Sequence, residues 1–228
     1  GELQPRAVIA EFDINLRPLD IAEALLARES KIIGFGVYIW NVAPTTEVIA
    51  IIKRVRPEIK IILGGPEVSY ETEGQKIVEL ADHVITGEAD LKFAEVCREL
   101  LNGRAGSPLP AEASIATEQR ARGDAPYLPK IIPAELPDFS RIVLPYDFYT
   151  EADIAHRIVY VEASRGCPFT CEFCLSSLDI PVRQVPLDEF LGAMQRLMDR
   201  GLKQFKFVDR TFNLNIAVSK EPLKFFLA

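Results

Sequence analysis

The first hundred residues alternate between segments typical of buried strands and segments typical of helices. Residues 31–38 and 59–63 are nearly unbroken apolar runs, the pattern of strands that are covered on both faces. Between them, apolar residues recur at helical spacing from Val48 to Val55, before Pro57. Strands that alternate with helices form parallel βαβ units, so the sequence predicts an open α/β sheet.

Weaker patterns extend this alternation along the chain. Further strands are predicted at residues 7–12 and 83–86, and further helices at residues 20–28, 75–80 and 90–101. A sheet of this kind binds ligands at the carboxyl ends of its strands. Three of the expected loops at that edge begin with glycine, at residues 36–41, 64–69 and 87–90. A tight turn explains any single glycine, but three at one edge favour a ligand site, where backbone can approach a ligand closely.

The composition changes after the first hundred residues. Seven of the chain's 16 prolines lie between residues 105 and 150, and proline-rich sequence without a period is typical of an extended connector. The aromatic stretch at residues 137–149 is expected to end this connector as an ordered strap. Beyond it, strands at 157–161 and 205–208 flank a helix at 188–200. We therefore predict domains at 1–104 and 151–228, joined by a linker at 105–150.

Three of the four cysteines lie close together in the second domain, at Cys167, Cys171 and Cys174. Thiolates at such spacing, in a chain without a disulfide framework, indicate a metal site and a reducing compartment, the cytoplasm. Three ligands on one loop can hold three irons of a 4Fe-4S cluster and leave the fourth iron open. Pro168 and Phe169 are expected to give this loop a partly dry pocket.

Other uses of the cysteines remain open at this point. Structural zinc would need a fourth ligand, for which Cys97 and His156 are the candidates. A ferredoxin-type cluster would also need a fourth cysteine, and only Cys97 is left. Cys97 falls on the apolar face of a predicted helix, where a buried thiol is the ordinary explanation. A catalytic thiol would explain one cysteine but not three.

The spacing C-x3-C-x2-C between a strand and a helix, with Arg165-Gly166 before it, resembles the motif of the radical SAM enzymes. The resemblance implies a 4Fe-4S cluster whose open iron binds S-adenosylmethionine (SAM). Reductive cleavage of SAM would give methionine and a 5'-deoxyadenosyl radical. By the same resemblance, Phe173, Ser176 and Asp209 are the expected SAM-binding residues, although Asp209 could merely solvate a turn and Ser176 could cap one.

The amino-terminal half resembles the cobalamin (vitamin B12)-binding domain that precedes the barrel in one subgroup of radical SAM proteins. The stretches that carry this similarity are residues 33–38, 63–67 and 86–88, together with residues 145–149 of the linker. The cobalamin-binding residues implied by it are Gly36, Tyr38, Gly64, Gly65, Pro66, Gly87 and Glu88. His83 is not expected to bind cobalt, because a lone histidine entering a strand more often has a structural role.

The chain departs from this subgroup in three ways. Gly36 stands where a serine or threonine usually contacts the nucleotide tail. The first strand of a flavodoxin-like sheet, which lies centrally in the order 2-1-3-4-5, is absent, so a gap is expected between residues 7–12 and 31–36. Only the opening βα units of a TIM-type radical SAM barrel fit after residue 151. The sequence is therefore expected to be an internal piece of a larger enzyme.

These expectations combine into a cobalamin-dependent radical SAM enzyme, with methyl transfer to an unreactive carbon as the expected reaction. Cyclisation or rearrangement is the alternative reaction, and an iron-sulfur binding or electron-transfer module is the non-enzyme alternative. No catalytic side chain is assigned. The expected partners are a small-molecule or peptide substrate and a reductant such as flavodoxin or ferredoxin. A net charge of -7 without a basic run argues against nucleic acid, and the absence of a long apolar stretch argues against a membrane.

Overall fold

The computed structural model describes residues 3–102, 128–174, 182–210, 212 and 216–227. The chain divides into two compact units, Gly1–Pro137 and Asp138–Ala228, here called the amino-terminal and carboxyl-terminal units. Ser176, one of the expected SAM-binding residues, lies outside the described residues. Each unit is described by itself.

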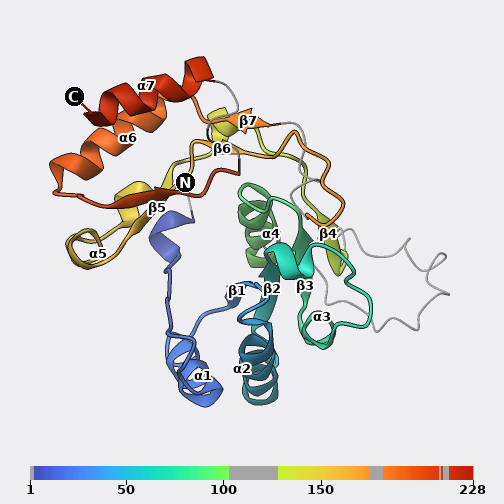
Figure 1. Cartoon of the computed structure of the whole chain (residues 1–228). Helices are drawn as coiled ribbons and strands as arrows, with labels where there is room; N and C mark the ends of the chain where they lie inside the picture. Colours follow the sequence, from blue (N-terminus) through green and yellow to red (C-terminus); the bar gives the residue numbers. More distant parts are fainter. Residues whose placement is uncertain (1–2, 103–127, 175–181, 211, 213–215, 228) are drawn as a thin grey trace. The chain divides into compact units, whose positions relative to one another are not determined.

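A four-stranded parallel sheet forms the centre of the amino-terminal unit (Figure 1). Its strands lie in chain order: β1 (Ile32–Gly36), β2 (Lys60–Gly64), β3 (His83–Thr86) and β4 (Ile131–Pro133). β1 and β2 pair over their whole length, from Ile32 opposite Lys60 to Gly36 opposite Gly64. The parallel α/β sheet predicted from the sequence is thus confirmed.

Helices cover both faces of this sheet. The side chains of α1 (Pro18–Leu26), α2 (Val42–Val55) and α3 (Lys76–Leu80) share one hydrophobic cluster, which also contains Ile61 and Leu63 of β2. The other face packs Ile62 against α4 (Lys92–Leu101). Successive strand residues point to opposite faces, so a strand buried on both sides must be apolar at every position. This requirement explains the unbroken apolar run in β2.

The strand predicted at residues 7–12 does not form, because these residues adopt no regular structure. Val8 and Ile9 are each 73% exposed, and a cavity of about 1130 Å³ is lined both by this segment and by the residues of β1. β-branched residues favour strands only where a neighbouring strand offers ladder partners and packing. No strand in the described part of the chain lies beside the outer edge of β1, so the segment has no ladder to join.

Of the stretch predicted as a linker, residues 105–150, the structure describes residues 128–150, and this part is not an extended connector. Ile131–Pro133 forms β4 and pairs in parallel with β3, from Val84 opposite Ile131 to Thr86 opposite Pro133. Proline cannot donate to a ladder and is confined to edge strands or strand ends, and β4 is an edge strand that ends with Pro133. The density of prolines concealed this short strand, and the chain passes from one unit to the other after Pro137.

The carboxyl-terminal unit contains the second predicted βαβ unit. β5 (Val159–Val161) and β8 (Phe205–Phe207) pair in parallel, and α6 (Leu187–Asp199) lies between them in sequence. A short antiparallel pair, β6 (Ser164–Arg165) with β7 (Arg183–Gln184), flanks the cysteine loop. The described part of the unit also includes α5 (Glu151–His156) and α7 (Ile216–Leu227). The strand, cysteine loop, helix and strand therefore occur in the predicted order.

The aromatic stretch before α5 packs into the core of this unit. Phe139 and Tyr146, in short 3-10 helices at Phe139–Arg141 and Pro145–Phe148, are 7% and 4% exposed. Both belong to the hydrophobic cluster built around Phe190 and Met194 of α6. The expected ordered strap is thus confirmed, and it belongs to the carboxyl-terminal unit.

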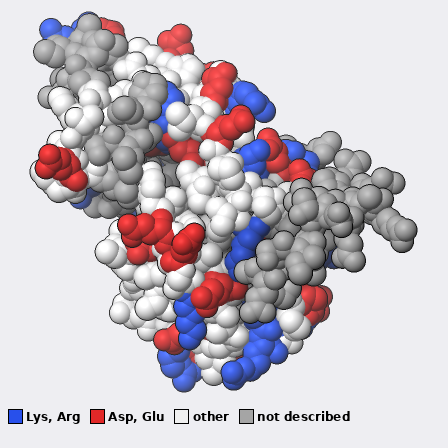
Figure 2. Space-filling model, turned by 90° about the vertical axis from the view of Figure 1, so that its right-hand side faces the viewer, with Lys and Arg blue, Asp and Glu red and all other residues white. Residues whose placement is uncertain are grey.

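The surface carries charges of both signs. On the face shown in Figure 2, Lys and Arg side chains are interspersed with Asp and Glu. Across the described residues, no helix combines the length and the apolar character needed to cross a membrane.

Candidate functional site

The loops that follow β1 and β2 are joined to each other by their backbones. The N–H of Val37 donates to the carbonyl of Gly64 at 2.7 Å, and the N–H of Glu67 donates to the carbonyl of Val37 at 3.3 Å. Gly65 packs against the backbone of Val37 and has a φ of +108. A Cβ placed on Gly65 would lie 2.5 Å from the Val37 oxygen. Only glycine fits such a contact, so the Gly64-Gly65 pair fixes how closely the two loops approach.

A serine joins the loop after β2 to the loop after β3. Ser69 Oγ donates to the carbonyl of Gly65 at 2.8 Å and accepts from the N–H of Gly87 at 3.1 Å. Gly87 has φ +78, which turns the chain sharply where β3 ends. Three loops that are far apart in sequence thus form one continuous rim at the carboxyl edge of the sheet. We call this rim, made by residues 36–41, 64–69 and 87–90, the glycine rim. Sequence reasoning missed Ser69, which carries no signal beyond its place four residues after the glycine pair.

An exposed aromatic pair stands on the same rim. Tyr38 and Trp40 stack with ring centroids 4.7 Å apart and planes within 8° of parallel, and Trp40 is 64% exposed. Asn41 holds the loop in this shape: its Oδ1 accepts from the N–H of Tyr38 at 2.8 Å, and its Nδ2 donates to the carbonyl of Gly36 at 3.0 Å. Neither Trp40 nor Asn41 was predicted as a site residue. An exposed aromatic surface beside accessible glycine backbone suits a large, partly flat ligand.

The structure brings the residues predicted to bind cobalamin to this one edge. They follow β1, end or follow β2, and follow β3; the set is Gly36, Tyr38, Gly64, Gly65, Pro66, Gly87 and Glu88. The unit's one histidine, His83, instead begins β3, at the opposite end of the strands. Its ring is fully buried, and its Nδ1 lies 2.9 Å from the carbonyl oxygen of Pro129. His83 therefore has a structural position, away from the glycine rim.

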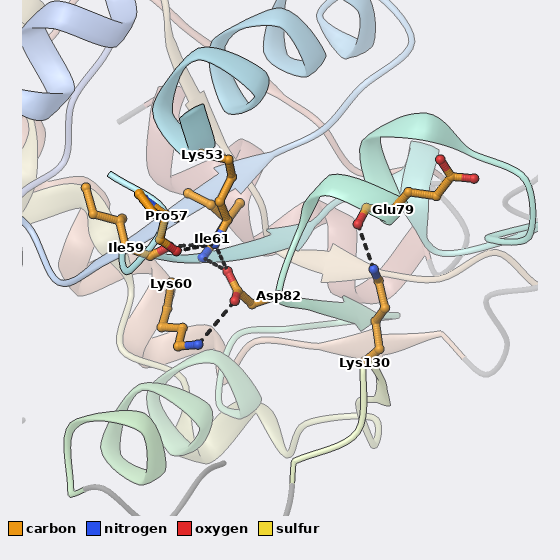
Figure 3. Close-up of polar contacts among 8 residues, drawn as sticks. All are labelled: Lys53, Pro57, Ile59, Lys60, Ile61, Glu79, Asp82 and Lys130. Atoms are coloured by element: carbon orange, nitrogen blue, oxygen red, sulfur yellow. Dashed lines mark hydrogen bonds and ion pairs between the residues drawn. The ribbon is translucent and has the colours of Figure 1, made fainter. Parts of the chain in front are cut away.

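The amino ends of the strands carry a partly buried charge network (Figure 3). Asp82 accepts from Lys53 Nζ, from Lys60 Nζ at 3.3 Å and from the backbone N–H of Ile61 at 2.8 Å. Burial acts to raise the pKa of Asp82, but the hydrogen bonds from Lys53 and Ile61, together with the positive charges of Lys53 and Lys60, hold the pKa below its ordinary value. Since this network lies at the edge opposite the glycine rim, its role is to tie β2 to the start of β3.

In the carboxyl-terminal unit the cysteine loop is anchored at its start and exposed beyond it. Gly166 turns the chain with φ +93 into Cys167, which is partly buried, whereas Cys171 is exposed and Phe173 is 94% exposed. Phe169 is 56% exposed, so the dry pocket expected around the cysteines is not formed by these rings. The N–H of Cys174 donates to the carbonyl of Cys171 at 3.1 Å, which folds the end of the loop back.

None of the four cysteines, all within the described residues, forms a disulfide. Within the same residues, no three His, Cys, Asp or Glu side chains lie close enough to hold a metal ion together. The donor set itself fits an iron-sulfur cluster, because three thiols lie within eight residues of one another in sequence, and such loops gather their thiolates when metal binds. Cys97 lies among Ile62, Ile85 and Val96 in the amino-terminal unit, and burial raises the pKa of its thiol.

Two side chains hold the segment that leads into the cysteine loop. Tyr146 OH accepts from the N–H of Glu162 at 2.8 Å and lies 3.2 Å from the Glu162 carbonyl oxygen. Burial of the phenol, more than any neighbouring charge, raises the pKa of Tyr146 to about 12. Asp209, predicted to bind SAM, accepts from the hydroxyl of Ser164 and the N–H of Ala163. Asp209 also lines a cavity of about 560 Å³, to which Phe173 does not contribute.

Residues 6–97 match the family model described as the B12 binding domain. The matched stretch contains β1, β2, β3 and all three loops of the glycine rim. A parallel α/β sheet whose ligand edge is built from glycine loops is the architecture of a nucleotide- or cofactor-binding domain. Together with this match, it supports a cobalamin-binding family for the amino-terminal unit.

Two relatives extend the similarity beyond that unit. An uncharacterized methyltransferase of Pyrococcus horikoshii is 28% identical over 200 residues, which cover 86% of this chain and 43% of that protein. The cobalamin-dependent radical SAM methyltransferase TokK of Streptomyces tokunonensis is 25% identical over 153 residues, covering 64% of this chain and 22% of TokK. The matches thus span less than half the length of either relative.

Among solved structures, the chain is similar to the N-terminal domain of a hypothetical protein from Thermotoga maritima. The similarity covers 58% of this chain and 82% of that one, with 18% sequence identity and a TM-score of 0.32.

Proposed function

We propose that this chain is part of a cobalamin-dependent radical SAM enzyme that methylates an unreactive carbon. The observation that carries the proposal is the glycine rim: three loops, joined through Val37, Ser69 and Gly87, at the ligand edge of a sheet that matches the B12 binding domain. Cysteines at the radical SAM spacing in the following unit support the second part of the proposal. So does the similarity to TokK, a protein named as such a methyltransferase.

In the amino-terminal unit, the proposed task of the residues is to bind and orient cobalamin. Gly36 and Gly87 are exposed, and without side chains they leave the backbone open to close approach. Gly65 keeps the loops after β1 and β2 in contact, so the rim is held in place before a ligand arrives. Trp40 and Tyr38 would cover an apolar part of the cofactor.

In the carboxyl-terminal unit, Cys167, Cys171 and Cys174 would hold a 4Fe-4S cluster as thiolates. When bound, the cluster and cobalamin supply the electron for reductive cleavage of SAM and a carrier for the methyl group. The chain's own task is to present three thiolates from one loop and to leave the fourth iron accessible to SAM. A small electron-transfer protein such as flavodoxin or ferredoxin is the proposed reductant, and the cytoplasm is the proposed compartment, since thiolate ligands need reducing surroundings.

Cobalamin binding is tested by titrating the 228-residue chain with hydroxocobalamin and following the absorbance spectrum. The proposal expects saturable binding at one site per chain. Gly65→Val should abolish it, because the added side chain would push Val37 away and open the rim. Gly201→Val is the matched control, since Gly201 also has positive φ but lies in the other unit with open space around it. If the wild type does not bind hydroxocobalamin, or if Gly65→Val and Gly201→Val bind it equally well, the cobalamin assignment is overturned.

Cluster and SAM binding are tested by anaerobic reconstitution with iron and sulfide. The wild type should take up about four irons per chain, and SAM should change the EPR spectrum of the reduced cluster and be cleaved. The triple variant Cys167→Ala, Cys171→Ala, Cys174→Ala should take up no cluster, whereas Cys97→Ala should behave as the wild type. A cluster indifferent to SAM would favour an electron-transfer module, and zinc in place of iron would exclude the radical SAM assignment.

A further inference from the structure

Asp209 links the end of one strand to the segment that precedes the cysteines. β8 ends at Phe207, and the N–H of Val208 donates to the carbonyl of Val161 at 2.9 Å, which extends the pairing with β5. One residue further, Asp209 Oδ1 accepts from Ser164 Oγ at 2.6 Å and Oδ2 accepts from Ala163 N–H at 3.1 Å. The carboxylate therefore bridges two chain segments that are 45 residues apart, at the point where the chain leaves β5 for the cysteines.

Other elements hold the rest of the same short segment. Tyr146 OH bonds to the backbone of Glu162, and the N–H of Val185 donates to the carbonyl of Ala163 at 2.9 Å. Ser164 and Arg165 pair with Gln184 and Arg183 across β6 and β7. The guanidinium groups of both arginines lie 5.4 Å from the centre of the Phe139 ring. Residues 162–165 are thus fixed by four different parts of the unit.

The cysteine loop beyond this segment has much less support. Ser164 is 9% exposed, whereas Cys171 and Phe173, less than ten residues later, are exposed. Cys167 follows Ser164 by three residues, one of which is Gly166 in the left-handed region. The position of Cys167 therefore depends on where residues 163 and 164 are held. Hydrogen bonds to a carboxylate are about twice as strong as neutral ones, so each bond from Asp209 is stronger than a neutral backbone bond to this segment.

We propose that Asp209 is a positioning residue: by accepting from Ala163 and Ser164 it fixes the origin of the cysteine loop and hence the geometry in which Cys167 binds iron. Asp209 acts through the loop and does not itself contact SAM. This inference rests on the proposed function, because it assumes that the cysteines hold a cluster. The anchoring is nevertheless a property of the protein without metal, so it can be measured separately.

The test compares Asp209→Asn with the wild type, first without iron. An amide nearly matches the carboxylate in shape but has one acceptor in place of two. Hydrogen exchange of the backbone amides at residues 163–174 should become about tenfold faster, while exchange in α6 stays unchanged. Asp147→Asn is the matched control, because Asp147 makes only a 3.4 Å surface contact with Arg196 and its side chain is 71% exposed; it should leave both regions unchanged.

The second readout is the reconstituted cluster. Asp209→Asn should lower cluster occupancy at least about twofold or shift the cluster's reduction potential, and Asp209→Glu should restore part of the loss. If Asp209→Asn does not fold, Ser164→Ala, which removes only the partner of Oδ1, replaces it in both measurements.

The outcomes separate this inference from the proposed function. A wild type that takes up no cluster would overturn the proposed function, whereas unchanged exchange in Asp209→Asn would overturn the positioning role. Normal exchange and a normal cluster combined with weakened SAM binding would show that Asp209 contacts SAM directly, which also contradicts the inference. Faster exchange together with a perturbed cluster and partial rescue by glutamate supports it.

Discussion

The backbone N–H of Ile61 in β2 donates a 2.8 Å hydrogen bond to the carboxylate of Asp82, the residue before β3. The same carboxylate accepts from Lys53 and Lys60, and its side chain is 11% exposed. Asp82→Asn leaves both ammonium groups without their counter-charge in a partly buried place. We expect the free energy of unfolding of the amino-terminal unit to fall by about 2 kcal/mol, measured by urea denaturation.

The ionisation of Asp82 also predicts how the stability of the amino-terminal unit depends on pH. Burial opposes ionisation of Asp82, but the hydrogen bonds from Lys53 and Ile61 and the charges of Lys53 and Lys60 together make its pKa lower in the folded than in the unfolded chain. Its contribution is therefore complete above the ordinary pKa and is lost as the pH falls through the folded value. The stability difference between wild type and Asp82→Asn should shrink between about pH 5 and about pH 2. Glu58→Gln, which breaks only an exposed pair with Arg56, should leave the stability almost unchanged. An equal loss in the two variants would contradict the network.

Gly65 should tolerate alanine far less well than Gly74. Both have positive φ, but a Cβ on Gly65 would lie 2.5 Å from the Val37 oxygen, whereas a Cβ on Gly74 meets nothing within 4 Å. Gly74→Ala should cost about 1 kcal/mol for backbone strain alone, and Gly65→Ala about 3 kcal/mol because Val37 must also move. Urea unfolding of the two variants measures the difference. Equal losses would mean that Val37 can move away from residue 65 without destabilising the protein.

Trp40 should contribute to cobalamin affinity without supporting the fold. Its ring is 64% exposed and contacts Tyr38 by stacking. Trp40→Leu should raise the Kd for hydroxocobalamin roughly threefold to tenfold and leave the unfolding midpoint unchanged. Phe148→Leu is the control, since Phe148 is a similarly exposed aromatic residue of the other unit, at 55%. An unchanged Kd in Trp40→Leu would remove the aromatic pair from the proposed site.

Tyr146 should stabilise the carboxyl-terminal unit through its hydroxyl group. Tyr146→Phe leaves the N–H of Glu162 without its partner, and we expect a loss of about 1–2 kcal/mol. Tyr160→Phe, at a side chain that is 54% exposed, should cost almost nothing. Because burial raises the folded pKa of Tyr146 to about 12, its contribution is present below the ordinary value of about 10 and declines as the pH rises above it. Spectrophotometric titration should show one tyrosine that ionises at higher pH than the others. This transition should be missing in Tyr146→Phe. If it persists in this variant, the raised pKa does not belong to Tyr146.

The sequence predicted the elements whose pattern is local. β1 and β2 lie in apolar runs between turn residues, and α2 and α6 repeat apolar residues at helical spacing. The strand predicted at residues 7–12 was wrong because strand propensity requires a neighbour, and Ile131–Pro133 was missed because two apolar residues between prolines carry almost no pattern. In both cases the deciding factor was the adjacent strand, present in one and absent in the other.

The candidate site divides in the same way. Glycines at strand ends and cysteines at fixed spacing are visible in the chain itself, because a tight turn or a metal-binding loop is built from residues close in sequence. The roles of other residues became visible only in the folded chain. Asn41 and Ser69 hold the loops of the rim by hydrogen bonds, and Ser164 donates a hydrogen bond to Asp209, 45 residues away in sequence. A hydrogen bond between distant segments leaves no periodic mark in a sequence. By itself, then, the sequence determined where the glycine and cysteine loops lie, and the tertiary structure decided which side chains hold those loops in place, because only folding brings a donor and its distant acceptor together.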